Sequence, residues 1–145
     1  MAFRFPLAAV LRVRESIEQR EERALQQIQQ EMARVVRQIE ELNAEIAKAH
    51  TAREEALQRP IPAVHLHTLL WEEQAAVERR KSLMAALPAL EQQRDKQMKI
   101  YHAAHRNHET LLSMKNEQRT HYELVQARTQ QKSLDDLFMA RRHGR

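Results

Sequence analysis

Eight histidines have the clearest potential for chemistry in this chain, and three of them lie close together. The segment YHAAHRNHE, residues 101–109, places His102, His105 and His108 at intervals of three. Residues at this interval share one face of a helix, where imidazoles can bind a metal ion. A structural zinc also needs a fourth ligand and an ordered second shell, which the sequence does not supply. We therefore predict solvated histidines, or histidines lining a contact between helices, and no metal site; the weaker HLH segment, residues 65–67, is interpreted in the same way.

Other groups that could support catalysis are scattered. The acidic pairs Glu72-Glu73 and Asp135-Asp136 are adjacent in sequence, and adjacent residues on a helix point apart. The chain has no glycine-rich phosphate loop, zinc-protease motif or nucleophile signature. It also has no cysteine, which excludes thiolate catalysis, disulfides and cysteine-based zinc sites. We predict a protein that is not an enzyme and needs no cofactor, with a metal-dependent enzyme as the alternative.

The composition indicates long helices. The chain has 145 residues, of which 30% are charged and only one is glycine. A single glycine leaves almost nothing for tight turns or left-handed helix caps. The positive excess is only four charges and acids are interleaved with the bases, which disfavours nucleic acid as a partner.

No targeting or membrane segment is predicted. No apolar run approaches the roughly 18 residues of a membrane span. In the opening MAFRFPLAAVLRVRES, the apolar run that begins at Pro6 is cut off by Arg12, too early for a cleavable signal. We predict a soluble cytoplasmic protein without direct membrane insertion.

The first long helix is predicted over residues 6–58. From Leu25 its apolar positions step alternately by three and four residues, the pattern of a coiled-coil seam. Such a helix is roughly 80 Å long at 1.5 Å per residue and needs a partner. The predicted seam consists of Leu25, Ile28, Met32, Val35, Ile39, Leu42, Ile46, Ala49, Arg53 and Ala56.

The prolines of RPIPAVH, residues 59–65, end this helix. We predict a turn over 59–63, a corner helix over 64–87, a restart at Pro88, a second long helix over 88–140 and a disordered tail over 141–145. The fold class is therefore all-α: a long antiparallel two-helix coiled-coil hairpin with a shorter helical segment at the corner, forming one elongated domain over 1–145.

The returning helix has a poorer seam, because Arg94, His108 and Lys115 share the column of Leu87, Tyr101 and Tyr122. The predicted pairing places Ile46 near Tyr101, Ile39 near His108 and Leu25 near Tyr122. Such an interrupted seam predicts marginal stability and a chain that gains stability from a partner.

The two ends of the chain are amphipathic, and the predicted pairing places them side by side. There we expect the exposed apolar residues Phe3, Phe5, Leu7, Val10, Leu134, Leu137 and Phe138, which either close the hairpin or bind a partner. Trp71, the only tryptophan, belongs either to a local core at the corner or to an interface.

The two ends carry a resemblance to a known family. The opening FRFPLAAVLRVRESIEQREE, residues 3–22, resembles the start of the FliJ family of flagellar export proteins. The segment QKSLDDL, Gln131 to Leu137, is similar to the Gln-Lys-x-Leu-Asp-Glu ending of that family. The chain departs from the pattern at Pro6 and at Asp136, and neither change obstructs a helix.

The resemblance implies a cytoplasmic component of the flagellar type III export apparatus, shaped like the central stalk of rotary ATPases. Its termini would bind the hexameric export ATPase and promote ring assembly and hydrolysis. Its corner would contact the cytoplasmic domain of the membrane export gate, and escort of export chaperones is also implied. The ATPase-contacting residues would be Phe3, Phe5, Leu7, Val10, Leu11, Gln131, Lys132, Leu134, Asp135 and Leu137; those contacting the gate would be Leu69, Trp71, Ala76 and Val77.

Two alternatives remain at this stage. One is the equivalent stalk of a virulence-type injectisome, in which the same hairpin would serve a different secretion machine. The other is a generic coiled-coil adaptor or a helical arm that binds nucleic acid, for which salt-dependent binding to duplex DNA would be the signature.

Overall fold

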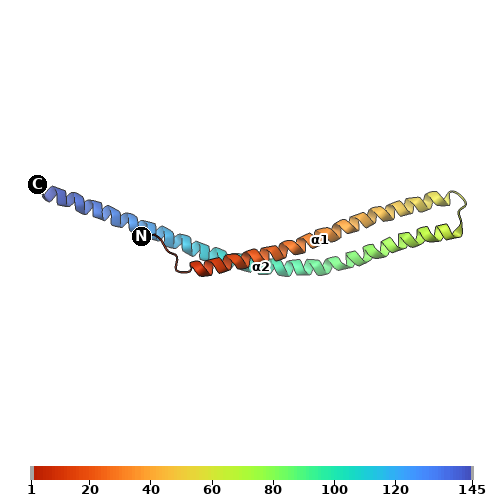
Figure 1. The fold of residues 1–145 in the computed structure, drawn as a ribbon, viewed down its shortest axis with the longest axis horizontal. Coiled ribbons are helices and arrows are strands. Elements are labelled where there is room, and N and C mark those ends of the chain that lie inside the picture. The colour runs from red at the N-terminus through yellow and green to blue at the C-terminus, as the bar shows by residue number, and fades with distance from the viewer. Residues whose placement is uncertain (1, 145) are drawn as a thin grey trace. The chain divides into compact units, whose positions relative to one another are not determined.

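The computed structural model describes residues 2–144 and contains two long helices (Figure 1). Helix α1 spans Ala8–Leu57 and helix α2 spans Ala63–His143. No strand occurs among the described residues, and stretches of α1 pack antiparallel on stretches of α2. The predicted all-α hairpin is therefore confirmed.

The turn between the helices is built by its two prolines. Helix α1 ends with tightened hydrogen bonds, in which the N–H groups of Gln58 and Arg59 donate to the carbonyls of Glu55 and Ala56 at 3.3 and 3.4 Å. Proline has no N–H with which to continue this ladder. The carbonyl of Pro62 then accepts from the N–H groups of His65 and Leu66, the third and fourth residues of α2, at 3.0 and 3.3 Å. Helix α2 thus begins directly after the proline pair.

Helix α2 runs through Pro88 without interruption, so the predicted division into a corner helix and a second long helix is wrong. Pro88 is exposed, as is Met84, whose carbonyl loses its usual partner at the proline. A carbonyl on the exposed face can be hydrated, which makes the proline tolerable within the helix. The helix also extends to His143, where a disordered tail was predicted, and the N–H of Gly144 donates to the carbonyl of Ala140 at 3.0 Å.

The chain divides into two compact units, of which unit 2 comprises Glu22–Ile100. In this unit the buried apolar residues are Val35, Leu42 and Ala76. All ten predicted seam positions of α1 are buried or half-buried, including Arg53. The Arg80 guanidinium also donates to the Asn43 side-chain oxygen across the helices at 3.0 Å. The heptad pattern therefore identified the packed face of α1 correctly.

Unit 1 comprises Met1–Glu21 together with Tyr101–Arg145. Its buried apolar residues are Phe5, Leu11 and Ala104. The residues before α1 lie along α2, as Figure 1 shows near the N-terminus. There the Phe3 and Tyr122 ring centroids are 5.7 Å apart, and the Arg119 guanidinium lies 5.8 Å from the Phe3 centroid. The N-terminal segment, residues 2–7, is thus fastened to α2.

The pairing of the helices differs from the prediction. Tyr122 contacts Phe3 instead of Leu25, and His108 contacts Glu18 instead of Ile39. The predicted pairing was displaced by about three heptads because it assumed a separate corner helix between two equal arms. A tight turn followed by one continuous helix instead pairs residues at equal distances on either side of the proline pair.

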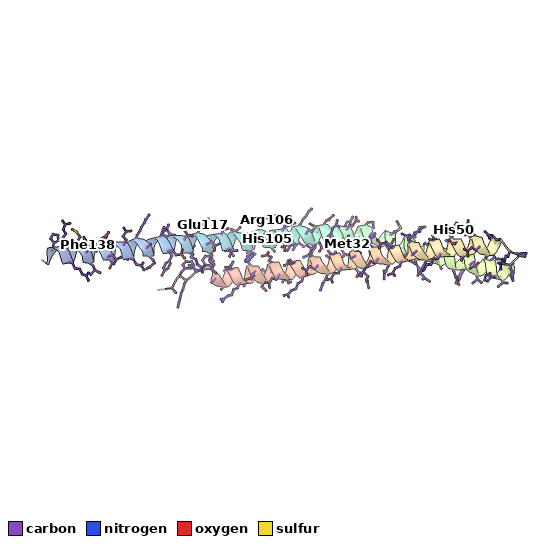
Figure 2. All side chains as sticks on the ribbon, turned by 90° about the horizontal axis from the view of Figure 1, so that it is seen from above. Met32, His50, His105, Arg106, Glu117 and Phe138 are labelled. Carbon is purple, nitrogen blue, oxygen red and sulfur yellow. The ribbon has the colours of Figure 1, made fainter. Side chains whose placement is uncertain are left out.

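Helix α2 is longer than α1, so this pairing leaves its C-terminal part without a partner helix within unit 1. Beyond the Phe3 contact at Tyr122, α2 continues to His143, roughly 30 Å at 1.5 Å per residue. We call residues 123–143 the C-terminal extension. Within unit 1, only the N-terminal segment reaches as far as the start of this extension, and Figure 2 shows Phe138 on the stretch where α2 is single.

Candidate partner-binding surfaces

The C-terminal extension exposes a concentration of large apolar side chains. Leu134, Leu137 and Phe138 are 66%, 59% and 68% exposed, and Met139 is also exposed. Five of the predicted ATPase-contacting residues lie here, and all are exposed: Gln131, Lys132, Leu134, Asp135 and Leu137. Contiguous apolar exposure of this kind is typical of a surface that binds a partner.

The N-terminal residues of the predicted set are divided by the fold. Leu7 and Val10 are exposed, Phe3 is half-buried, and Phe5 and Leu11 are buried at 7% and 8% exposure. The expectation that Phe5 lies open at the end of the hairpin is therefore wrong. Phe5 belongs to the N-terminal segment, which continues along α2 beyond the start of α1 instead of forming a helix from Pro6 (Figure 1).

The expected side-by-side placement of the two ends is also wrong. The N-terminal segment meets α2 at Tyr122, well before the Gln131-Leu137 segment. Sequence reasoning also missed Val13 and Met139, which are 57% and 49% exposed. Val13 could have been found from its position on the same helical face as Val10, whereas Met139 gave no signal beyond its apolar character.

Glu18 joins the histidine segment to α1 within unit 1. Its carboxylate lies 2.7 Å from Nδ1 of His105 and 2.5 Å from Nδ1 of His108 (Figure 2 labels His105). Partial burial acts to raise the pKa of Glu18, but hydrogen bonds and charge from the two imidazoles outweigh it and hold that pKa below its ordinary value. The hydrogen bond to Glu18 in turn raises the pKa of His105.

The histidines therefore take part in the contact between the helices. His105 and His108 line this contact, whereas His102 is exposed. Among residues 2–144, no group of three or more His, Cys, Asp or Glu side chains is arranged to hold a metal ion.

The corner of the hairpin, residues 58–77, exposes the second apolar surface. Trp71 is 71% exposed, so it is not the centre of a local core. It lines a shallow groove with the residues Arg53, His67, Leu70, Glu73, Gln74 and Val77. Among the other predicted gate residues, Leu69 and Val77 are half-buried, but Ala76 is buried between the helices and has little surface to offer.

An ion pair fixes the floor of this groove. The Arg53 guanidinium lies 2.7 Å from the Glu73 carboxylate, and both side chains are largely buried. Arg53 also lies 2.8 Å from Nδ1 of His50. Because Arg53 occupies a seam position, this pair connects α1 to α2 close to the turn and orients the face that carries Trp71. Leu70 and Val64, both exposed, are additional apolar residues that sequence reasoning missed.

Neither helix, within the described part of the chain, has an apolar stretch of the length and hydropathy needed to cross a membrane. The fold instead presents exposed apolar surfaces at the extension and at the corner, on helices that otherwise pair with each other. These features define a helical hairpin protein that leaves apolar surface exposed.

The comparison with protein families agrees with this class and narrows it. The chain belongs to the FliJ family, since the family profile described as the flagellar FliJ protein matches residues 3–145. The protein is thus a component of the flagellar export apparatus, and the family is non-catalytic. Searches of curated proteins and of solved structures gave no match.

Proposed function

We propose that this protein binds the hexameric flagellar export ATPase as a stalk-like rod, promotes ring assembly and hydrolysis, and links the ring to the export gate. The observation that carries the proposal is the C-terminal extension, where Leu134, Leu137 and Phe138 are exposed on a helix that α1 does not cover. Membership of the FliJ family supplies the machine in which the surface acts.

The extension suits the centre of a ring for a physical reason. A single helix has a diameter of about 10–12 Å with its side chains, so it enters a narrower opening than a helix pair does. Its apolar residues would be removed from water against the ATPase, with Gln131, Lys132 and Asp135 as polar contacts at their border. The half-buried and buried Phe3, Phe5 and Leu11 would hold the N-terminal segment on α2, while Leu7 and Val10 remain accessible.

Stimulation of hydrolysis would arise without catalytic groups on this chain. A rod with an uneven surface contacts the subunits of a ring differently, and it can favour one subunit conformation only through such differential contacts. The paired helices would make the rod stiff, and the extension would contact the ATPase subunits. The protein would thus alter the population of ATPase states and leave the chemistry to the ATPase.

The corner is the surface that we assign to the cytoplasmic domain of the export gate. Trp71 is the expected anchor, because exposed tryptophans are enriched among residues that dominate binding energy. Leu69 and Val77 would contribute their exposed parts, whereas Ala76 would act by close packing of the hairpin. We further propose a cytoplasmic location, peripheral to the inner membrane through these contacts. Escort of export chaperones would be an additional role, for which we assign no residues.

The test is ATP hydrolysis by the export ATPase of the same organism, with and without this protein, combined with electron microscopy of ring formation. Wild-type protein should stimulate hydrolysis and increase the number of rings. Deleting residues 131–145 should abolish stimulation while leaving the fractional helicity nearly intact. Trp71→Ala is the matched control, since it should lower binding to the gate domain and leave stimulation unchanged. Full stimulation by the deletion variant would reject the extension as the ATPase contact.

The equivalent stalk of a virulence injectisome is the second candidate. Membership of a flagellar family favours the flagellar machine over the injectisome and over a generic coiled-coil adaptor. Stimulation of an injectisome ATPase but not of the flagellar one would reverse this preference.

A further inference from the structure

Three of the exposed apolar residues of the C-terminal extension, Leu124, Leu134 and Phe138, lie on a different face from the one that is covered earlier along α2. Tyr122 and Gln126 are half-buried and mark the covered face, which continues along the extension as Thr129 and Ser133. At 3.6 residues per turn, Leu124, Leu134 and Phe138 lie between about a third and about a half of a turn away from that line. The stripe that they form is therefore not an unfilled continuation of the hairpin.

The spacing of this stripe is that of a coiled-coil seam. Leu124, Ala127, Gln131, Leu134 and Phe138 follow one another at alternating steps of three and four. All five are exposed, and no α1 residue within the described chain covers the stretch that bears them. A helix with such a seam buries it against another helix of matching pattern.

The charges that border the stripe identify the matching helix. Arg128 and Asp135 lie along one border of the stripe. Among residues 2–144, neither has an ion-pair partner. Because these opposite charges stand on opposite sides of Gln131, the pattern is complementary to itself when a second copy is turned end for end.

We propose that two copies of this chain pair antiparallel through residues 123–142, with Gln131 near the two-fold axis. Arg128 of each copy then lies opposite Asp135 of the other. A two-fold interface repeats this contact, so the border carries two attractive pairs. A central glutamine costs stability but fixes the alignment of the helices, as polar seam residues do in coiled coils.

The seam covers about two heptads and contains one glutamine and one alanine, so the pairing is weak and reversible. We expect a dissociation constant on the order of tens of micromolar, in the range of small transient interfaces. The inference does not rest on the proposed function, since it concerns the protein alone. In this pairing, a second copy covers the extension at high protein concentration, and the extension becomes exposed again on dilution.

The experiment is sedimentation equilibrium of the full-length protein over a concentration series up to about 300 µM, well above the expected dissociation constant. Wild-type protein should pass from monomer to dimer. Arg128→Asp or Asp135→Arg alone places like charges opposite each other and should weaken dimerisation about tenfold. An equimolar mixture of the two variants restores both attractive pairs in a heterodimer, so it should dimerise as the wild type does.

Matched controls separate this alignment from a general effect of charge. Lys132→Asp and Asp136→Arg make the same changes on the outward face and should leave dimerisation intact. A wild type that stays monomeric throughout the series would overturn the proposal. So would a mixture that dimerises no better than its components, and so would an Asp135→Arg protein that still dimerises, since parallel pairing places Asp135 opposite Gln130.

Discussion

His105 on α2 and Glu18 on α1 lie 2.7 Å apart and are joined by a hydrogen bond that tethers the two helices within unit 1. His108 approaches the same carboxylate from the next turn of α2. A single acid on α1 therefore holds two imidazoles of the return helix, one of which, His108, is a polar residue that interrupts the seam.

The first prediction concerns pH. The pKa of His105 is raised above its ordinary 6.5 in the folded state, so its contribution to stability is complete below about 6.5 and is lost as pH rises through the raised value. The pKa of Glu18 is lowered from 4.5, so its contribution is present above 4.5 and is lost as pH falls through the lowered value. Thermal unfolding followed by circular dichroism should show the greatest stability between about pH 4.5 and pH 6.5, and a decline from there toward pH 8.

The matched variant for this prediction is Glu18→Gln, which should flatten the decline above pH 6.5 because the imidazoles lose their charged partner. Glu22→Gln, at an exposed acid one turn further along α1, should keep the wild-type profile. An unchanged profile in Glu18→Gln would show that other groups govern the pH dependence.

The second prediction compares two phenylalanines of unit 1. Phe5 is 7% exposed and Phe138 is 68% exposed. Phe5→Ala should lower the free energy of unfolding by about 1–3 kcal/mol, less than in a globular core because a two-helix interface collapses easily around the gap. Phe138→Ala should change stability little. Chemical denaturation measures both, and equal losses would contradict the burial of Phe5.

The third prediction concerns the proline within α2. Pro88→Ala restores an N–H that can donate to the Met84 carbonyl and removes the steric clash of the ring. Alanine is about 3 kcal/mol more favourable than proline within a helix, and the greater freedom of the unfolded chain offsets part of this. We expect a gain of about 1–2 kcal/mol in thermal unfolding. A loss of stability would mean that Pro88 itself contributes to the pairing of the helices.

The fourth prediction concerns the stability of the isolated chain. Only six residues are buried among the described apolar side chains, in a hairpin with no third element to cover it. The thermal transition should be broad and centred below 70 °C, and it should rise when the export ATPase is added because the partner binds only the folded chain. A sharp transition well above 70 °C without a partner would contradict this account.

The helical pattern of α1 was predictable because its heptads are nearly unbroken from Leu25 to Ala56, and the face that they define is the packed one. The position of the turn was also predictable, since two prolines must end a helix. The pairing of residues between α1 and α2 was not predictable, because it depends on whether Pro88 interrupts α2. Tolerance of a proline depends on hydration of one carbonyl and on the pairing of the remaining residues, which no local pattern encodes.

Some residues of the candidate surfaces were predicted correctly and others were not, because exposure also depends on tertiary contacts that no local pattern encodes. Exposure of Leu134, Leu137 and Phe138 followed from their amphipathic segment, but Phe5 and Leu11 were assigned to the open end although the fold buries them. The burial of Phe5 depends on the N-terminal segment continuing along α2, a tertiary contact made by Phe3, Arg119 and Tyr122. Residue type and spacing alone do not distinguish an aromatic residue that fastens a segment from one that awaits a partner.

The unequal lengths of α1 and α2 also have a mechanical consequence. Where two helices run together, bending one requires the other to slide or stretch along it, so the pair resists deflection. The extension has no such neighbour, and a lone helix of this length bends and twists much more readily while keeping its internal hydrogen bonds. A partner that grips residues 123–143 would therefore hold a compliant tip and could turn or tilt it before any load reached the paired part of unit 1.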